Sequence, residues 1–508
     1  MSGWNKFAIK TRRRSLLISI LSDYFMAIER RNFFLAILTA FLGTHFVEIA
    51  KSQDRTRQQR EVVTVSMKRA ATYYRDQVSV RGGYVYHYTL DLKTRWGEGL
   101  ASKDQIWVQP PATPTIGMAY LQAYEATGDR FYLDAAKAAA EALVYGQVKS
   151  GGWRNAIDFD PKGTNAAQYR NGKGNSKGSN SSSLDDGQTQ SALQFLTLAD
   201  KALGFENATI HESVAIGFRA LLDAQFSNGG FPQVWTGPVT SQKPTQANYP
   251  VYDWRTEGRI KNYWDMYTLN DNTTGYIAQA LVEASHVYQD AKYKEALKRL
   301  GDFIILAQMP DPQPGWAQQY NFAMQPIWAR KFEPPGVSGD ETQEAIETLM
   351  LIYRETNDAR YLAPIPKALQ WLRQSLLPGN LLARYYELKT NRPLYMERDG
   401  EKYSLTYDDQ RLPEHYGWKT ESRVELLEKR FQQCKAGKIE EAKPSKAEWT
   451  RHAASIVKQL DADGRWVTTF SGERLVGQAK FIAGDRYLSS QIFSKNLTAL
   501  AEFLQATK

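Results

Sequence analysis

Apolar residues recur at helical spacing in four similar blocks of the chain. In the second block, Ala192, Phe195 and Leu196 fall on one face of a helix. Each block contains an amphipathic helix, a short break, a second helix, and a turn rich in glycine and aromatic residues. The blocks span 114–161, 185–235, 270–320 and 340–388, so that their starts are 70 to 85 residues apart. This pattern predicts a repeated helical hairpin.

A helical hairpin with one apolar face must stack on its neighbours to bury that face. Hairpins stacked around an axis give an α/α barrel, or toroid, in which the turns after the second helices line one rim. The sequence therefore predicts an all-α fold, an α/α barrel of repeated helical hairpins with rim loops and little β structure.

The flanks of the four blocks complete the predicted domain organisation. Segments 82–88, "GGYVYHY", and 463–467, "DGRWV", resemble degenerate copies of the turn. We expect an export or anchor leader at 1–50, a helical flank at 51–111, the barrel at 112–431, and a helical segment at 432–508 that completes the barrel or packs on it. Segment 82–99 is also a candidate part of a substrate groove, and the Gly, Ser and Asn-rich stretch 172–183 predicts a mobile loop.

The N-terminus has the pattern of an export segment. Arg30 and Arg31 precede an apolar run at 33–42, which at ten residues is short for a membrane span. We favour export, to the periplasm or the medium, over an uncleaved membrane anchor.

Composition narrows the function. Aromatic residues make up 12% of the chain, with 13 Trp and 28 Tyr, and the net charge is +9. Abundant aromatics are typical of proteins that stack sugar rings, and the positive charge permits an anionic partner. The sequence has no helix-turn-helix, zinc-finger or RNA-binding signature, so we predict no nucleic-acid partner. A single cysteine, Cys434, excludes an internal disulfide and a cysteine-ligated zinc site.

Acidic or amide residues stand at three of the predicted helix starts: Asp185 and Asp186, then Asn270, Asp271 and Asn272, then Asp340 and Glu341. Such residues commonly cap helices and favour the positive end of the helix dipole. On neighbouring starts of one rim, Asp185, Asp186 and Asp271 could also converge as oxygen ligands, which favours Ca²⁺. We expect at least one of Asp185 and Asp186 to cap its helix as well.

Two basic and aromatic stretches are candidates for binding an acidic polymer. The first, "WARKFEPP", carries Arg330 and Lys331; the second, "LLARYYELKTNRPLY", carries Arg384, Lys389 and Arg392. Both could be solvated faces whose side-chain stems pack on tyrosines. Arginine also binds carboxylates through two parallel hydrogen bonds, which suits a polymer with one carboxylate on each sugar.

These motifs together resemble a known family. "LDDGQTQSALQFL", "GGFPQVW", "TLNDNTTGYI", "WARKFEPPGVSGDET" and "LLARYYELKTNRPLYMERDG", followed by "HYGWKT", are similar in content and order to the pectate lyases of polysaccharide lyase family 10, over about residues 112–431. The resemblance implies an α/α barrel that cleaves polygalacturonate by calcium-assisted β-elimination. Segment 236–261 and the loop before Asp185 are longer than the family pattern.

The resemblance also implies roles for single residues. Asp185, Asp186 and Asp271 lie at the calcium-binding positions, and Arg384 matches the arginine that acts as base. Arg330 belongs to a motif expected to contact substrate, and the further substrate-binding candidates are Lys331, Lys389, Arg392, Asn272 and Trp235.

The chemistry of elimination agrees with these roles. The C5 proton, α to the uronate carboxylate, is too weakly acidic to leave unaided, and Ca²⁺ on that carboxylate stabilises the developing charge. An arginine base needs a desolvated, cationic neighbourhood that favours its neutral form, for which Lys389, Arg330 and Lys331 are candidate sources.

Several alternatives remain open from the sequence. Trp153 and Trp235 are either sugar platforms or core residues that close a hairpin. The same barrel could be a glycoside hydrolase that uses two of the aspartates as acid and base, or a non-catalytic protein that binds acidic polysaccharide. We expect a monomer.

Overall fold

The computed structural model describes residues 26–27, 54–240, 243–438, 444–477 and 479–508. The apolar run of the predicted leader lies outside these residues. No helix within the described ranges is both long and apolar enough to cross a membrane. The chain forms two compact units, residues 1–65 with Thr507 and residues 66–506 with Lys508. In the first unit the structure describes a helix at 54–65, and the second unit carries the rest of the fold.

The four predicted hairpins are present in the second unit. They are α2 (Thr113–Thr127) with α3 (Arg130–Gly146), α4 (Gln188–Ala202) with α5 (Ala208–Asp223), α6 (Thr273–Tyr288) with α7 (Ala291–Ala307), and α8 (Gly339–Thr356) with α9 (Ile365–Gln374). The breaks have ordinary physical causes. Gly128 ends α2 in the left-handed conformation, and the side chains of Asp129, Asn207 and Asp290 cap the second helices of their hairpins.

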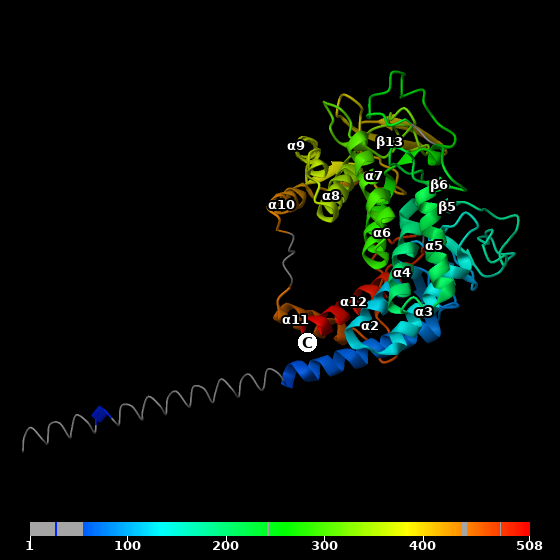
Figure 1. The fold of residues 1–508 in the computed structure, drawn as a ribbon, viewed down its shortest axis with the longest axis vertical. Helices are drawn as coiled ribbons and strands as arrows, with labels where there is room; N and C mark the ends of the chain where they lie inside the picture. The colour runs from blue at the N-terminus through cyan, green and yellow to red at the C-terminus, as the bar shows by residue number, and fades with distance from the viewer. Residues whose placement is uncertain (1–25, 28–53, 241–242, 439–443, 478) are drawn as a thin grey trace, which may run out of the picture. The chain divides into compact units, whose positions relative to one another are not determined.

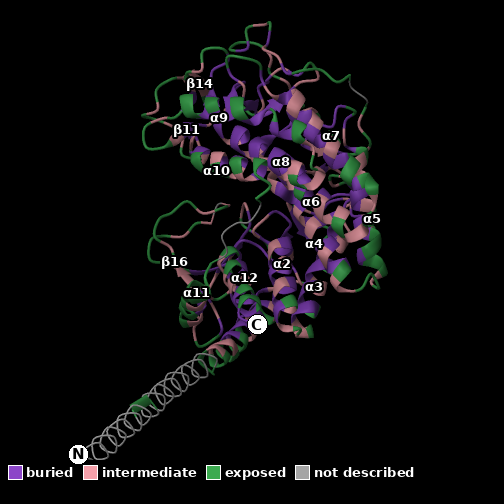
Figure 2. Ribbon diagram, turned by 60° about the vertical axis from the view of Figure 1, so that its left-hand side comes forward, coloured by how far each residue is buried: buried purple, intermediate pink, exposed green. Residues whose placement is uncertain are grey.

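The first helices of successive hairpins pack on one another. α2 packs on α4, α4 on α6, α6 on α8, and α8 on α10 (Val424–Lys435), while α12 (Ser490–Ala506) packs on α2 and on α11 (Lys446–Lys458) (Figure 1). Each of α3, α5, α7 and α9 packs on the first helix of its own hairpin. Buried positions run along the helices of this series (Figure 2). The predicted class, an all-α fold of stacked helical hairpins, is confirmed.

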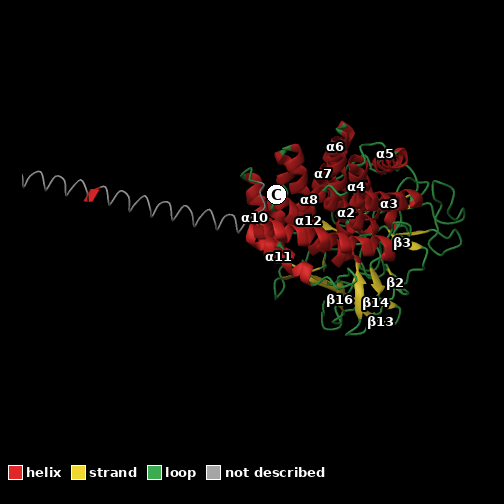
Figure 3. Ribbon diagram, turned by 90° about the horizontal axis from the view of Figure 1, so that it is seen from below, coloured by secondary structure: helices red, strands yellow, loops and turns green. Residues whose placement is uncertain are grey.

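Short strands gather on one side of the helices (Figure 3). A five-stranded sheet has the order β14 (Lys402–Thr406), β13 (Pro393–Asp399), β12 (Tyr385–Tyr386), β10 (Val337–Ser338), β8 (Trp316–Ala317), and a four-stranded sheet has the order β16 (Val467–Thr469), β17 (Arg486–Ser489), β1 (His87–Thr89), β2 (Arg95–Trp96). The remaining strands form pairs: β3 (Gln105–Trp107) with β4 (Ala156–Asp158), β5 (Ser182–Ser183) with β6 (Val234–Trp235), β7 (Tyr267–Thr268) with β9 (Gln319–Tyr320), and β11 (Leu381–Ala383) with β15 (Lys419–Glu421). Most have only two or three residues. In the predicted helical flank at 51–111, the described residues are helical from 54 through the π-helix η1 (Tyr74–Val78), after which the chain forms β1, β2 and β3.

Tryptophans in several turns make the same hydrogen bond to the helix that precedes the turn. The indole N–H of Trp153 donates to the Leu143 carbonyl at 2.8 Å, that of Trp316 to Ile304 at 2.7 Å, and that of Trp466 to Ile456 at 3.0 Å. Each bond joins the turn to the end of the preceding helix. The shared bond shows that 463–467 is a copy of the hairpin turn, and that Trp153 is a core residue rather than a sugar platform.

Candidate active site

Two similar left-handed turns present the predicted aspartates. The 3₁₀ turn η2 (Asp185–Gly187) precedes α4, and η4 (Asn270–Asn272) precedes α6. Asp186 and Asp271 have φ of 45° and 50°, and each is followed by a second residue with positive φ. Asp and Asn tolerate this region better than other non-glycine residues. The two turns pack against each other, so that the structure brings these aspartates together.

The predicted capping role of Asp185 or Asp186 is wrong. The N-cap residue of α4 is Gly187 and that of α6 is Asn272, and neither makes a side-chain capping bond. The carboxylates of Asp185, Asp186 and Asp271 instead contact side chains of other residues.

Buried glutamines orient two of these carboxylates. Gln233 donates from Nε2 to Oδ1 of Asp185 at 2.6 Å, and Gln109 donates from Nε2 to Oδ2 of Asp186 at 2.8 Å. Gln109 also contacts Oε1 of Glu98 at 3.2 Å. Glu98 thus joins the site from segment 82–99, which the sequence indicated only as a candidate part of the groove.

Burial and neighbouring carboxylates raise the pKa values of Asp185 and Asp186. Burial, followed by the charge of Asp271, raises the pKa of Asp185 to about 6. Burial raises the pKa of Asp186 to about 8, with further contributions from Asp271, Asp185 and Glu98. A site that is costly to ionise in this way is stabilised by a bound cation.

Arg384 lies in contact with this cluster. Its Nη2 donates to Oδ1 of Asp271 at 3.0 Å and lies 3.5 Å from Oε1 of Glu341, and its Nη1 lies 3.5 Å from Oδ2 of Asp340. The side chain is 13% exposed, and its guanidinium lies 4.9 Å from the ring centre of Tyr416. Three carboxylates and one ring therefore surround a largely buried cation.

The predicted cationic neighbourhood of Arg384 is wrong. Burial alone lowers the pKa of Arg384, but Glu341, Tyr416, Tyr385 and Asp271 outweigh burial and raise it well above its ordinary value. Lys389 instead lies with its ammonium 5.7 Å from the ring centre of Tyr249, and Lys331 is exposed. The contacts of Arg384 stabilise its charged form.

Arg330 is the second arginine of the site and the more accessible one. It is 44% exposed, its Nη2 contacts Oε1 of the buried Glu333 at 2.5 Å, and its guanidinium lies 5.8 Å from the ring centre of Tyr416. Tyr416 therefore lies within reach of both arginines. Its hydroxyl donates to Glu333 at 3.0 Å and lies 2.8 Å from the Tyr385 hydroxyl. Tyr416 lies in the motif "HYGWKT", yet the sequence did not single it out.

The remaining predicted substrate residues differ in position and in exposure. Asn272 donates its backbone N–H to Glu344 at 2.9 Å beside the aspartates, and Arg392 is exposed with its guanidinium 3.6 Å from the ring centre of Tyr407. Trp235 is only 4% exposed. Its predicted role as a sugar platform is corrected, because a ring inside the core offers no face to a sugar.

Asp185, Asp186 and Asp271 suit a hard divalent cation in donor type and in charge. Within the described ranges, however, no group of three or more His, Cys, Asp or Glu side chains is arranged to hold a metal ion. Asp271 is engaged by Arg384 and by the amide of Asn270, at 3.0 and 2.6 Å. The three carboxylates therefore match calcium in donor type and charge, but they are not arranged as a preformed metal site.

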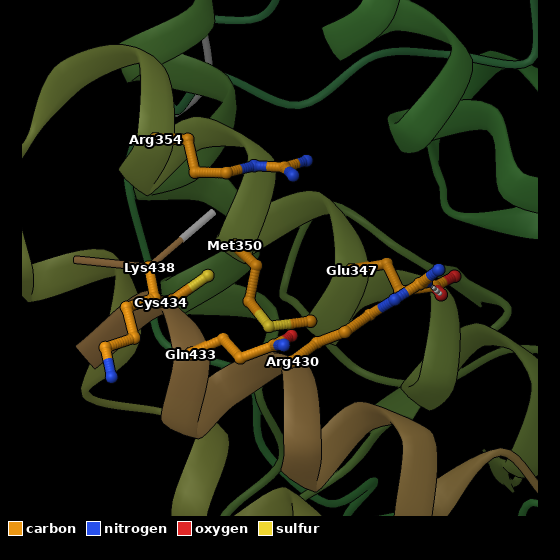
Figure 4. Close-up of a pocket in the computed structure, with 7 residues that line it drawn as sticks. All are labelled: Glu347, Met350, Arg354, Arg430, Gln433, Cys434 and Lys438. Carbon is orange, nitrogen blue, oxygen red and sulfur yellow. Dashed lines mark hydrogen bonds and ion pairs between the residues drawn. The ribbon is translucent and has the colours of Figure 1, made fainter. Parts of the chain in front are cut away.

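Two cavities lie on α8. One is bounded by α8 and α10, where Glu347 pairs with Arg430 at 2.9 Å close to the buried Cys434 (Figure 4). Burial raises the pKa of the Cys434 thiol, which disfavours a nucleophilic role. The other, of about 450 Å³, extends from Asn272 to Glu347 and Arg354. Neither is lined by Asp185, Asp186 or Arg384.

Comparison with known proteins shows that part of this chain is similar to polysaccharide lyases. The pectic acid lyase family matches residues 147–380, a range that contains both left-handed turns and Arg330 and ends just before Arg384. The predicted resemblance to pectate lyases is thereby confirmed over that range. No curated protein matches the chain.

Several solved structures are similar to the chain. A variant of a family 10 polysaccharide lyase from Cellvibrio cellulosa, in complex with trigalacturonic acid, is 20% identical, with 63% of this chain and 98% of that chain covered and a TM-score of 0.45. The same lyase in another structure is 21% identical, with 63% and 97% covered and a TM-score of 0.45. Cellobiose 2-epimerase from Spirochaeta thermophila is 15% identical, with 89% and 98% covered and a TM-score of 0.45.

Proposed function

We propose that this protein is a pectate lyase that cleaves α-1,4-polygalacturonate by calcium-assisted β-elimination and releases 4,5-unsaturated oligogalacturonides. The observation that carries the proposal is the contact of Arg384 with Asp271, by which a candidate base lies against a cluster of part-buried carboxylates. The family match supports a polysaccharide lyase, and trigalacturonic acid in the complex of a family 10 lyase supports the substrate.

The two arginines have different parts in this proposal. Arg330, the exposed one, binds a uronate carboxylate of the substrate. Arg384 takes the C5 proton, for which it must be neutral. Burial favours the neutral form and the carboxylates oppose it, so that Arg384 becomes a better base when those carboxylates are engaged by another cation.

Asp185, Asp186 and Asp271 are the residues proposed to hold Ca²⁺. The ion would supply positive charge for the substrate carboxylate and for the enolate-like charge that develops beside it. Gln233 and Gln109 orient two of the carboxylates through their amide N–H groups. Fixing these side chains in advance lowers the cost of organising the site.

We further propose that the protein is exported, to the periplasm or the medium, and acts as a monomer. The proposal of export rests on Arg30, Arg31 and the apolar run at 33–42. A membrane anchor in the same segment is the competing proposal. Comparing the N-terminal residue of protein recovered outside the cytoplasm with that of the full chain distinguishes cleavage from anchoring.

The proposed activity is tested with polygalacturonate, with Ca²⁺ and with EDTA. Lyase action gives ultraviolet absorbance from the unsaturated product and is lost in EDTA. Reducing ends without unsaturation, unaffected by EDTA, would show a hydrolase, and an unchanged chain length would show a binding protein.

The role of Arg384 is tested with Arg384→Lys, using Arg373→Lys as a matched control. Arg373 is a partly exposed arginine of α9 that pairs with Glu428 on α10. We expect Arg384→Lys to abolish product formation with an unchanged helical circular dichroism signal, while Arg373→Lys retains activity. Undiminished turnover by Arg384→Lys would remove Arg384 as the base.

A further inference from the structure

A rim segment, residues 251–265, lies between β6 and β7 and carries Trp264. The 3₁₀ turn η3 (Tyr263–Asp265) within it contains no buried residue. Trp264 is 36% exposed and is the one tryptophan of the described residues that ranks among the exposed large apolar side chains. The other tryptophans of the hairpin turns are core residues, so an exposed indole beside the candidate site requires a separate explanation.

A backbone hydrogen bond links Trp264 to Gln233, which contacts the carboxylate cluster. The backbone N–H of Gln233 donates to the Trp264 carbonyl at 2.9 Å, while the side chain of Gln233 donates to Asp185 at 2.6 Å. One residue thus connects the indole-bearing turn to a proposed calcium ligand. The ring of Tyr263 lies 5.1 Å from that of Trp264, at 75° between the planes.

Charged groups of the candidate active site also affect Tyr263 in η3. Burial raises the pKa of Tyr263, with contributions from Glu333 and Asp185 and an opposing one from Arg330. Tyr263 therefore lies within electrostatic range of both the carboxylate and the arginine sides of the candidate active site. Trp264 is its immediate neighbour.

The first half of the rim segment is anchored on the loop that carries Arg330. The indole N–H of Trp328 donates to the Trp254 carbonyl at 2.7 Å. Arg259 forms a β-bridge with Trp328, and its guanidinium lies 4.8 Å from the centre of the Trp328 ring. Arg259 is exposed and donates from Nη2 to the Lys331 carbonyl at 3.5 Å.

The rim segment is also anchored by an ion pair between the part-exposed Arg255 and a buried glutamate. Arg255 contacts Glu387, whose side chain is almost fully buried and also accepts a hydrogen bond from Tyr407 at 2.5 Å. Contacts at Trp254, Arg255, Arg259 and the Trp264 carbonyl therefore hold the backbone of this segment, which carries an exposed indole and an exposed cation, beside the loop of Arg330 and beside Gln233.

We propose that Trp264 and Arg259 form an outer subsite for one further galacturonate residue of the polymer. The indole stacks on the pyranose ring, and the guanidinium binds the carboxylate of that residue. This inference rests on the proposed function, which supplies the substrate class. It extends that function by predicting a preference for chains long enough to reach the rim segment.

The test compares kcat/KM on tri-, tetra-, penta- and hexagalacturonate for the wild type, Trp264→Ala and Arg259→Ala. We expect the ratio of kcat/KM on hexagalacturonate to that on trigalacturonate to fall about tenfold in each variant, the size of one stacking or charged contact. Trp264→Phe, which keeps a smaller aromatic face, should restore much of the ratio. An unchanged ratio in Trp264→Ala, or a loss equal on all lengths, would overturn the outer subsite.

Val251→Ala is the matched control for disturbance of the rim segment. Val251 is 95% exposed and belongs to the same segment, so this variant should behave as the wild type on all lengths. If the wild type forms no unsaturated product, the proposed function fails, and retardation in gels that contain polygalacturonate then tests the subsite alone. Weaker retardation of Trp264→Ala than of Val251→Ala supports the subsite, and equal retardation overturns it.

Discussion

Replacing Arg384 with methionine removes the cation from a site of three carboxylates while it keeps most of the apolar stem. Glu341, one of those carboxylates, has a side chain with no solvent exposure, and its other contact is the hydroxyl of Ser338. Burial raises the pKa of Glu341 to about 7, and Arg384 opposes that rise. Without Arg384 the pKa of Glu341 rises further, so its ionised form becomes costlier to keep in the folded protein.

The size of the stability loss follows from the burial of the Arg384–Glu341 ion pair. Removing one partner of a buried ion pair costs about 3–5 kcal/mol, because the other charge stays behind. We expect the free energy of unfolding of Arg384→Met to fall by about that amount at pH 8, where the folded variant either keeps Glu341 ionised without Arg384 or holds it protonated above its wild-type pKa of about 7. At pH 5 Glu341 is protonated, and the loss should be about 1–2 kcal/mol, from the Tyr416 ring contact and the two part-exposed aspartates.

Urea unfolding at pH 5 and pH 8, followed by tryptophan fluorescence, measures both losses. The double variant Arg384→Met with Glu341→Gln should recover at least half of the loss at pH 8, since no buried charge remains. Arg373→Met, which breaks a part-exposed pair with Glu428, should cost less than about 1 kcal/mol at either pH. A loss in Arg384→Met that is independent of pH and is not reduced by Glu341→Gln would refute the reasoning.

Three further outcomes are expected. Adding Ca²⁺ should raise the melting temperature more at pH 8 than at pH 5, because the ion binds the ionised forms of Asp185 and Asp186. Their raised pKa values make the ion-free protein less stable as pH rises from the ordinary value of 3.8 to about 6 for Asp185 and to about 8 for Asp186. An equal shift at both pH values in calorimetry would contradict the calcium site. Trp235→Phe should lower the free energy of unfolding by less than about 2 kcal/mol and retain product formation, because Trp235 is a core residue; loss of product with intact stability would return Trp235 to the substrate site. Glu347→Gln should cost about 1 kcal/mol in urea unfolding, since its pairs with Arg423 and Arg430 are each about one-third exposed; a cost above about 3 kcal/mol would show that these pairs act as a buried network.

The hairpins could be predicted from the sequence because each helix is long enough for its 3.6-residue period to show. The rim strands could not, since elements such as β6 and β12 have two residues, too few for any alternation. Two tryptophans show the same limit. Packing against the surrounding chain buries Trp235 and leaves Trp264 exposed.

The sequence predicted which residues belong to the candidate site better than it predicted their contacts. Acidic helix starts pointed to Asp186 and Asp271, but the sequence pattern is equally that of a cap, and the left-handed backbone separates the two interpretations only in the structure. Arg384 and Asp271 are 113 residues apart in the chain, so their contact depends on how distant hairpins stack. The sequence therefore supplied a cationic neighbourhood for Arg384 where the fold places an anionic one.

The two left-handed turns, 185–187 and 270–272, are equivalent backbone turns on the rim. Asp185, Asp186 and Gly187 match Asn270, Asp271 and Asn272 position by position, and each turn ends in two successive residues of positive φ. Helix α8 begins instead with a regular Ser338 cap and is not preceded by a third turn of this kind. Because only Asp, Asn and Gly occupy such a backbone at low cost, exchanges among these three residues change the charge at the rim one unit at a time. The path of the chain stays the same, which makes the charge of the site adjustable independently of the fold.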